Sequence, residues 1–420
     1  MKKSILLSVL VMCFAIFSCP AFAQQYITLG VPTSLNLLEG KEANLATRLA
    51  VEEINASGGV KVGKEERLLR VESLDIRDGE PGVPVSEALL GLEKLILDKK
   101  VYATIVGNFR SEALLAAMDI YAKYKVINIA TISMTPKFES LIAGEKQKYK
   151  YCFRMCLDSA NLALTLQDLM KYLAKEFGFN KVFIATQDAL WAVGTGALMD
   201  KWFKENGWTV VAFEKYPMNA PGDFSTGLMK AKIGGAQVIL PIFDMAQAGT
   251  LVKQWKAMKV PAVMAGFNSC LIGAKAWDTF NTFGEDIDGT LNVVFELGHL
   301  PVKAYPPSIR FYDAYKKRYR AEVQGGHGVS GAYDAVYVLV NAIEKAGTLD
   351  PDKVSDAMEK TDMAGSVGRI RFSEGHQLQF GSDPKTGACA TVFQWRKAQR
   401  VEVYPEAIAD GKIIKPSWMK

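Results

Sequence analysis

The stretch VYATIVGNFRSEALLAAMDIYAKYKVINIATISMTPKF, residues 101–138, decides the fold. Val101–Val106 is a short apolar run rich in β-branched residues, which predicts a buried strand. Ser111 lies where a helix N-cap is expected, and residues 112–124, which follow it, are strong helix formers. A second short strand is expected at residues 126–130. The stretch therefore predicts a strand–helix–strand unit of an α/β sheet.

Two polar loops, residues 107–110 and 131–136, follow the two strands of this unit. In open α/β sheets, small ligands bind at the carboxyl ends of the strands. The free N–H groups at the start of a helix also suit an anion such as a carboxylate. We therefore expect Ser111 to contact a ligand. The alternative is that its side chain only caps the helix.

Strand and helix patterns alternate with similar spacing on both sides of residue 150, which predicts two parallel-sheet α/β domains. The length of 420 residues fits two or three domains. The other expected strands are 27–31, 68–74, 182–186, 209–213, 238–242, 262–265, 291–295 and 370–372, with an antiparallel hairpin at 392–395 and 400–403. The other expected helices are 42–56, 85–98, 160–177, 195–206, 224–233, 247–258, 307–320 and 332–345.

The composition is that of a globular protein, with 49% hydrophobic and 23% charged residues. The net charge of +5 includes no long basic run, so no nucleic-acid partner is expected. Residues 1–23 have a basic start, a short apolar run and an Ala-Phe-Ala end, which predicts a secretory signal peptide. The alternative is a lipid anchor at Cys19, whose surroundings loosely resemble a lipoprotein processing site.

Four cysteines follow the expected signal peptide: Cys152, Cys156, Cys270 and Cys389. Their spacings fit no zinc pattern. Cys152 and Cys156 lie in a segment expected to be extended, where their Cα atoms are about 13 Å apart, too far for a disulfide. A disulfide between Cys270 and Cys389 is left open.

The sequence contains little that indicates an enzyme. None of its three histidines (His299, His327 and His376) pairs with another at metal-ligand spacing, and each is expected at the surface or at a hinge. There is no P-loop and no G-x-S-x-G nucleophile elbow. Asp188 and Asp244 follow expected strands and can either bind a ligand cation or cap a turn. We expect no catalytic residue, metal or cofactor.

Four segments together carry a resemblance to a known family: residues 45–59, 105–111, 151–154 and 330–337. They resemble the first helix, the ligand-binding loop, the first hinge crossing and a late helix of type I periplasmic binding proteins. The specific resemblance is to the leucine/isoleucine/valine-binding family that feeds ABC importers. It runs from about residue 27 to the C-terminus.

The resemblance implies two Rossmann-like lobes joined by a three-strand hinge, which close on a ligand. The N-terminal lobe is expected at 24–150 plus 296–363, and the C-terminal lobe at 151–295 plus 364–420. It further implies a monomeric periplasmic protein that delivers a small polar ligand to an ABC permease in the inner membrane. A branched-chain amino acid is the first expectation for the ligand.

In the first lobe, the resemblance implies that Ser111 contacts the ligand carboxylate and that Arg110 lies beside it. The loop after the second strand of the opening stretch is expected to offer backbone and hydroxyl groups to both ends of the ligand. The candidates there are Ala130, Thr131, Ser133 and Thr135.

In the second lobe, the resemblance implies that Trp191 covers the ligand and that Asp244 and Met245 lie where the family often has an aromatic residue. Asn268 falls where amino-acid binders carry an acidic residue for the ligand ammonium, and an amide cannot neutralise that charge. Either Asp244 takes over the charge, or the ligand is an amide or an amine-free acid. A ligand-sensing subunit and an exported cleft enzyme are the rival functions.

Overall fold

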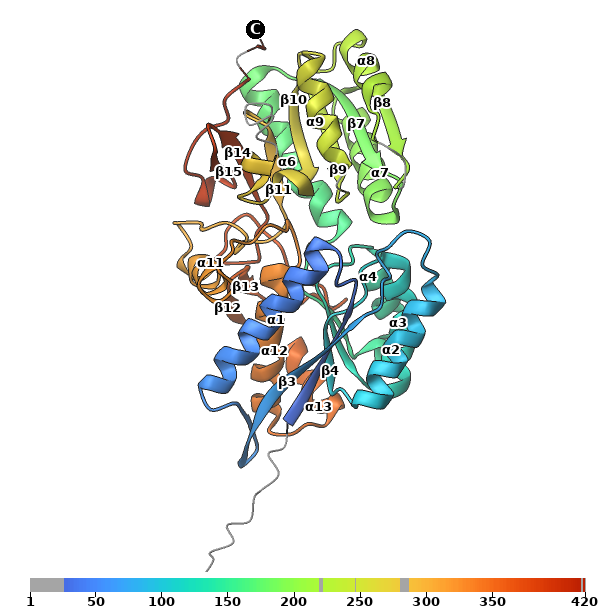
Figure 1. The fold of residues 1–420 in the computed structure, drawn as a ribbon, viewed down its shortest axis with the longest axis vertical. Helices are drawn as coiled ribbons and strands as arrows, with labels where there is room; N and C mark the ends of the chain where they lie inside the picture. Colours follow the sequence, from blue (N-terminus) through green and yellow to red (C-terminus); the bar gives the residue numbers. More distant parts are fainter. Residues whose placement is uncertain (1–25, 219–221, 246, 280–286, 417, 420) are drawn as a thin grey trace, which may run out of the picture.

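The computed structural model describes residues 26–420 except 219–221, 246, 280–286, 417 and 420. The expected signal peptide at 1–23, with Cys19, lies outside the described residues. The chain forms two α/β lobes stacked along the long axis of the molecule (Figure 1). Among the helices of the described part, none is both long and apolar enough to cross a membrane.

The first lobe is built on a six-stranded sheet that is parallel except for its edge strand. In sheet order its strands are β2 (Val60–Val62), β3 (Glu65–Asp75), β1 (Tyr26–Thr33), β4 (Ala103–Val106), β5 (Ile127–Ala130) and β6 (Cys152–Arg154). Its helices are α1 (Leu38–Ala56), α2 (Val85–Lys99), α3 (Ser111–Tyr124), α4 (Lys137–Gly144), α5 (Lys146–Tyr149), α11 (Pro306–Tyr319), α12 (Val329–Ala346) and α13 (Pro351–Glu359).

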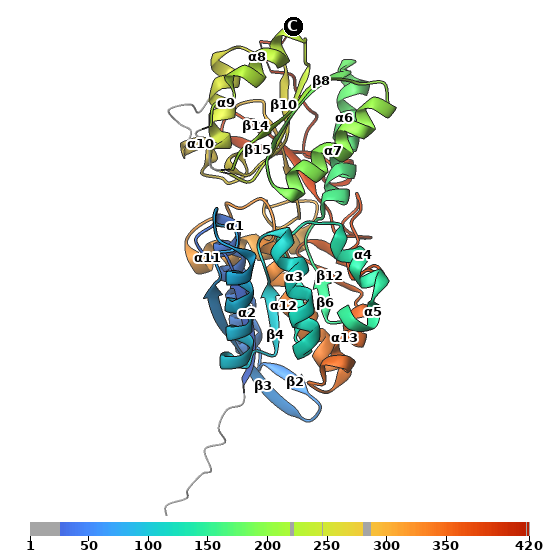
Figure 2. The ribbon, with the colours of Figure 1, turned by 90° about the vertical axis from the view of Figure 1, so that its right-hand side faces the viewer.

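Helices cover both faces of this sheet, with α1 beside α12 on one face and α2 beside α3 on the other (Figures 1 and 2). The opening strand–helix–strand unit is present as β4, α3 and β5, which confirms that prediction. Gly58 and Gly59 follow α1 with φ of 109° and 93°, a conformation that ends a helix and that glycine adopts without strain.

The second lobe has a seven-stranded sheet whose central strands are parallel. In sheet order the strands are β15 (Gln399–Tyr404), β14 (Thr391–Arg396), β11 (Leu291–Val294), β10 (Val263–Asn268), β9 (Val238–Phe243), β7 (Lys181–Gln187) and β8 (Thr209–Tyr216). Its helices are α6 (Ser159–Phe177), α7 (Leu190–Glu205), α8 (Ser225–Ile233), α9 (Ala248–Ala257) and α10 (Ala276–Thr279). The expected antiparallel hairpin is confirmed as β14 and β15.

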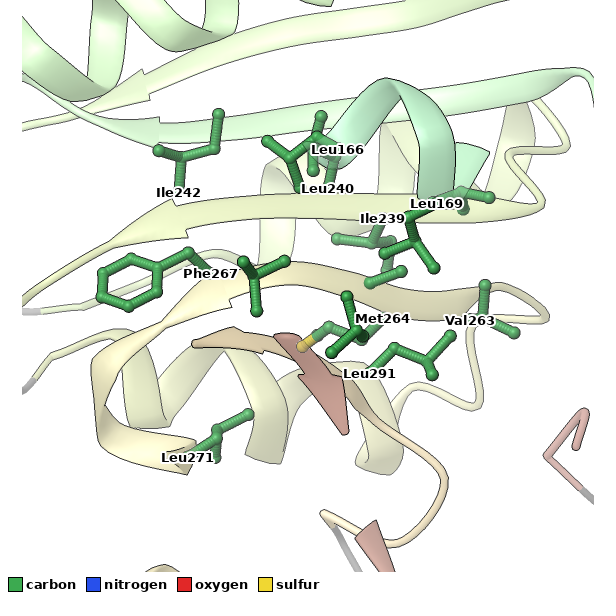
Figure 3. Close-up of a cluster of buried hydrophobic side chains, with 14 of the residues drawn as sticks. Leu166, Leu169, Ile239, Leu240, Ile242, Val263, Met264, Phe267, Leu271 and Leu291 are labelled. Carbon is green, nitrogen blue, oxygen red and sulfur yellow. The ribbon is translucent and has the colours of Figure 1, made fainter. Parts of the chain in front are cut away.

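The core of the second lobe explains why its central strands β9 and β10 are almost entirely apolar rather than alternating. All six residues of β9 and of β10 are buried. Leu166 and Leu169 of α6 pack toward side chains of these strands, such as Ile239 and Leu240 (Figure 3). Strands of a parallel sheet are covered on both faces, so both faces favour apolar residues.

The buried hydrophobic residues also indicate where the chain passes from one lobe to the other. Residues 367–388 contribute Val367, Ile370 and Leu378 to the core of the first lobe, whereas Cys389 belongs to the core of the second. The segment begins within the small hairpin of β12 (Met363–Gly365) and β13 (Gly368–Ile370). We propose a last crossing near residue 389, in place of the boundary at 363/364 expected from the sequence.

Buried polar groups form hydrogen bonds that hold the crossing between the lobes at residues 154–158. Arg154 is fully buried, and its guanidinium donates to the Thr135 carbonyl at 2.7 Å and to Gln377. Glu296, at the second crossing, accepts from the Leu157 N–H at 3.2 Å and from Gly328. Buried polar groups of this kind require such partners, so the hinge is specified by side-chain contacts as well as by its strands.

Candidate functional site

A cavity of about 620 Å³ lies between the lobes and is lined by residues of both. Nearly all of its lining segments come after strands: residues 36–39 after β1, 109–112 after β4, 132–134 after β5, 187–191 at the end of β7, and 244, 245 and 247 after β9. The carboxyl ends of both parallel sheets therefore face one another across the cavity. This is where open α/β sheets bind small ligands.

Of the ten residues expected to bind ligand, the structure places six in the cavity lining and four outside it. The lining residues are Arg110, Ser111, Ser133, Trp191, Asp244 and Met245. The residues outside it are Ala130, Thr131, Thr135 and Asn268. The part that each lining residue plays in binding stays a prediction.

Ser111 is the first residue of α3 rather than its N-cap, which is Arg110, and that correction changes what its side chain does. No side chain caps this helix. The Ser111 hydroxyl instead accepts a hydrogen bond from the Ser133 hydroxyl at 3.4 Å, across the ends of β4 and β5. Helix capping therefore does not account for Ser111, whose hydroxyl lies at the cavity beside a free helix terminus.

Asp78, in the turn after β3, fixes the loop that carries Ser111. Its carboxylate accepts from the backbone N–H of Phe109 at 2.7 Å and of Arg110 at 3.2 Å, and from the Ser34 hydroxyl at 3.1 Å. Burial raises the pKa of Asp78 to about 6. The only signal in the sequence is an acidic turn, which gives no hint that its partner lies 31 residues further along the chain.

The Arg110 guanidinium is partly bound by the protein itself. Its Nη2 donates to the Val83 carbonyl at 2.7 Å, and its Nε is buried without a hydrogen-bond partner among the described residues. Because a guanidinium has five donors in a fixed fork, part of this group remains available toward the cavity that it lines.

Asp244, at the end of β9, is held by its neighbour at the end of β7. Gln187 donates to the Asp244 carboxylate at 2.5 Å and accepts from the Asp244 N–H at 2.8 Å. The Trp191 side chain also hydrogen-bonds to this carboxylate. Burial is the largest influence on the carboxyl and raises its pKa to about 6, against these hydrogen bonds, which lower it. Gln187 was not predicted from the sequence.

Trp191 and Met245 supply the apolar part of the wall in the second lobe. The Trp191 ring packs edge-on against Phe267 at a centroid distance of 5.9 Å. The expected helix began at residue 195, but α7 begins at Leu190 and therefore carries Trp191 in its first turn. Trp191 is thus held by a helix rather than by a loop, in a cavity whose exposed wall is more apolar than polar, as small-molecule sites are.

Glu39 is a candidate functional residue that was not predicted from the sequence. It lies in the first turn of α1, lines the cavity and is only 3% exposed. Its Oε1 has no hydrogen-bond partner among the described residues. Burial, reinforced by the charge of Asp244, raises the pKa of Glu39 to about 8. The helix expected from the sequence begins at residue 42, which leaves Glu39 outside it, whereas α1 begins at Leu38.

Of the four predicted residues outside the lining, Asn268 and Thr135 have side chains that bond to other groups. Asn268 donates to the Ala248 carbonyl at 3.1 Å and accepts from the Cys270 N–H at 3.2 Å, as the cap of a 3₁₀ turn. The Thr135 hydroxyl accepts from the Lys137 N–H at 3.3 Å. Ala130 and Thr131 are buried at the end of β5, and the Thr131 hydroxyl has no hydrogen-bond partner among the described residues.

The three histidines are all buried, which corrects the expectation of a surface position. Two of them do lie beside hinge residues: His299 is 3.5 Å from Glu296, and the His376 carbonyl accepts from the Arg154 N–H at 3.0 Å. His327 lines the cavity, and burial lowers its pKa to about 3, so it is neutral at pH 7. Burial also lowers the pKa of His299 to about 4. In the described part of the chain, no three His, Cys, Asp or Glu side chains are grouped so as to hold a metal ion. Cys270 and Cys389, whose pairing the sequence leaves open, do not form a disulfide with each other.

Comparison with known proteins shows which protein family this sequence matches. A model of the family described as periplasmic binding protein matches residues 33–400. Leu/Ile/Val-binding protein homolog 8 of Brucella abortus is 24% identical over 392 residues, which cover 90% of each chain.

Two solved structures share the fold. One is the branched-chain amino acid transporter substrate binding protein LivJ from Streptococcus pneumoniae, in complex with isoleucine. It has a TM-score of 0.71 and 21% identity, covering 93% of this chain and 100% of that one. The other is an ABC transporter solute binding protein from R. palustris in complex with benzoate. It has a TM-score of 0.70 and 16% identity, covering 91% of this chain and 99% of that one.

Proposed function

The chain belongs to the type I periplasmic binding protein family, and we propose that it captures a small carboxylate-bearing solute for an ABC importer. A branched-chain amino acid is the first candidate. The protein is exported by its signal peptide, closes on the solute between its lobes and delivers it to a permease in the inner membrane. It binds and releases the solute without chemical change.

The observation that carries this proposal is the cavity at the carboxyl ends of both sheets. On one side it presents Ser111 and the start of α3, which suit a carboxylate. On the other side it presents the Asp244 carboxylate, which suits an ammonium group. A ligand enclosed there loses its water, so both of its polar ends need partners from the protein. Contacts from both lobes also favour the closed state.

Substituting Ser111 with alanine is expected to weaken the binding of a carboxylate ligand by about tenfold or more. A hydrogen bond to a charged group contributes roughly 1.5–3 kcal/mol, and the substitution removes only the hydroxyl. Isothermal titration calorimetry with wild type and Ser111→Ala measures the effect. Ser225→Ala, in the first turn of α8 outside the cavity lining, is the control. Equal affinities in all three proteins would remove Ser111 from the site.

Two classes of solute are candidates for the ligand: amino acids on the one hand, and amine-free acids or amides on the other. The S. pneumoniae relative was solved with isoleucine and the R. palustris relative with benzoate, which has no amine. Asn268 is turned into the protein here and so leaves the acidic position of amino-acid binders unfilled. Asp244 lies in the cavity lining and provides a carboxylate in its place. On this basis, an amino acid is preferred to an amine-free acid or an amide.

A thermal-shift screen of the mature protein, residues 24–420, tests the proposed function. The panel contains branched-chain, aromatic, acidic and small amino acids, then urea, short amides, and aromatic and aliphatic acids. A ligand at a hundredfold excess over its dissociation constant stabilises the folded state by about 2.7 kcal/mol. We expect stabilisation by at least one amino acid. An absence of any shift across the panel would contradict the proposal.

The rival functions make different predictions about the bound solute. An exported enzyme converts its ligand, whereas a transport protein returns it unchanged. Incubation with the best ligand of the screen, denaturation and mass spectrometry of the released molecule separates the two. Intact ligand is expected. A sensing subunit also returns intact ligand, so gene neighbours that encode a permease and an ATPase are the evidence that distinguishes transport from sensing.

A further inference from the structure

We propose that Glu39 and Asp244, one carboxyl from each lobe, together form the binding site for a cationic amine of the ligand. The proposal rests on the proposed function and narrows its substrate class to amine-bearing solutes. Amine-free acids of the same shape are then poor ligands.

The two carboxyls approach one cavity from opposite lobes. Glu39 extends from the first turn of α1 in the first lobe, and Asp244 follows β9 in the second. Both line the same cavity. The charge of Asp244 acts directly on Glu39, so the two groups are within electrostatic reach of one another. A cation between them interacts with both lobes at once, which is what a ligand must do to favour closure.

Apart from a hydrogen bond to its own backbone N–H, no contact among the described residues explains the burial of the Glu39 carboxyl. Glu42, one turn further along α1, is also buried, but its carboxylate accepts from the backbone N–H groups of Gln324 and Gly325 at 3.0 and 2.7 Å. Glu39 Oε1 has no such partner among the described residues. A buried polar atom without a partner is costly. An N–H donor of a ligand ammonium group would give Glu39 Oε1 the hydrogen-bond partner that it lacks.

The charges around the cavity favour the same class of ligand. Among the described lining residues, five are acidic, namely Glu39, Glu80, Glu112, Asp188 and Asp244, and Arg110 is the single base. Arg110 already donates to the Val83 carbonyl, and His327 is neutral at pH 7. The cavity as a whole therefore has an excess of negative charge that a cationic group on the ligand offsets.

The pairing of Glu39 with Asp244 also predicts how the affinity for the ligand changes with pH. The groups that act on Glu39 are Asp244, Glu42 and the Cys270 thiol, with neutral His327 also in the lining. With a pKa of about 8, Glu39 is mostly protonated at pH 7, and Asp244, with a pKa of about 6, is mostly charged. An ammonium ligand favours the charged carboxylate, so its binding releases a proton. Affinity therefore rises as the pH is raised from 6 to 8.

Isothermal titration calorimetry with matched ligand pairs tests the proposal. Each pair shares a carbon skeleton and differs by the amine: L-leucine with 4-methylpentanoate, L-phenylalanine with 3-phenylpropanoate, and L-glutamate with glutarate. Titrations are run in phosphate and in Tris, whose different ionisation enthalpies reveal proton release. The proteins are wild type, Glu39→Gln and Glu52→Gln. Glu52 is a matched control because it lies on α1 but pairs with Arg318 at the surface.

For wild type, at least one amino acid is expected to bind about tenfold or more tightly than its amine-free partner, with proton release at pH 7, since only the amino acid forms charge-assisted hydrogen bonds to the two carboxyls. Glu39→Gln is expected to lose about tenfold in affinity for that amino acid and to lose the proton release. Glu52→Gln is expected to behave as wild type. Glu39→Gln keeps the shape of the side chain, and its unfolding temperature without ligand shows that it folds.

Two results would overturn the inference while leaving the proposed function intact: equal binding of an amino acid and its amine-free partner, or unchanged amino-acid affinity and proton release in Glu39→Gln. If none of the six compounds binds, the matched pair is the strongest amino acid of the thermal-shift screen and its amine-free acid. Binding of no compound of that screen contradicts the proposed function itself, and the inference falls with it. Asp244→Asn, in the separately packed second lobe, gives an independent measure of the same pair.

Discussion

Replacing Arg154 with methionine is expected to lower the free energy of unfolding by about 3–5 kcal/mol, the cost of removing one partner of a buried ion pair. The guanidinium is fully buried, 3.4 Å from the Asp158 carboxylate and 3.6 Å from that of Glu139. It also binds Gln377 and the Thr135 carbonyl. Methionine fills similar space but leaves two carboxylates without their counter-charge.

Urea denaturation followed by circular dichroism measures this change. Arg369→Met is the matched control, because Arg369 pairs with Asp362 and both side chains are well exposed. Exposed ion pairs contribute about 0–1 kcal/mol, so the control is expected to unfold nearly as wild type does. A loss of less than about 1 kcal/mol in Arg154→Met would show that the hinge does not depend on this group.

Replacing Asp244 with asparagine is expected to weaken amino-acid binding by about tenfold to a hundredfold or more, because a charge-assisted hydrogen bond to the ammonium is worth roughly 1.5–3 kcal/mol. Asparagine keeps an oxygen that can accept from Gln187, as the carboxylate does at 2.5 Å. The substitution therefore removes the charge and changes the local geometry little. Binding of an amine-free acid is expected to be unchanged or stronger.

Calorimetry of wild type, Asp244→Asn and Asp188→Asn measures the effect. Asp188 is an exposed residue at the edge of the same cavity, so its neutralisation reports only the screened influence of charge at a distance. Retention of full amino-acid affinity by Asp244→Asn would place the partner of the ligand ammonium elsewhere in the cavity.

Much of the fold follows from local sequence patterns. The alternation of apolar strands with helical segments is enough to predict both parallel sheets, and the opening unit is present as β4, α3 and β5. Element ends are less well determined. Helix α1 begins at Leu38, without a capping side chain at the preceding residue, and α7 likewise begins at Leu190 with no capping side chain. Both starts lack the N-cap signal on which prediction of a helix start depends.

The site shows where prediction from sequence stops. Residues at strand ends, such as Ser111, Ser133 and Asp244, can be placed near the cavity because strand ends in a parallel sheet meet at one edge. Asn268 is at such an end too, but the turn after it directs its side chain toward Ala248. Asp78 and Gln187 owe their importance to partners 31 and 57 residues away, which no local pattern reveals.

A crystal structure of the complex with the strongest ligand of the thermal-shift screen tests the central claim most directly. We expect one ligand molecule between the lobes, with its carboxylate within hydrogen-bond distance of Ser111 and its amine between Glu39 and Asp244. A ligand bound outside this cavity, or held by groups of one lobe only, would contradict the account.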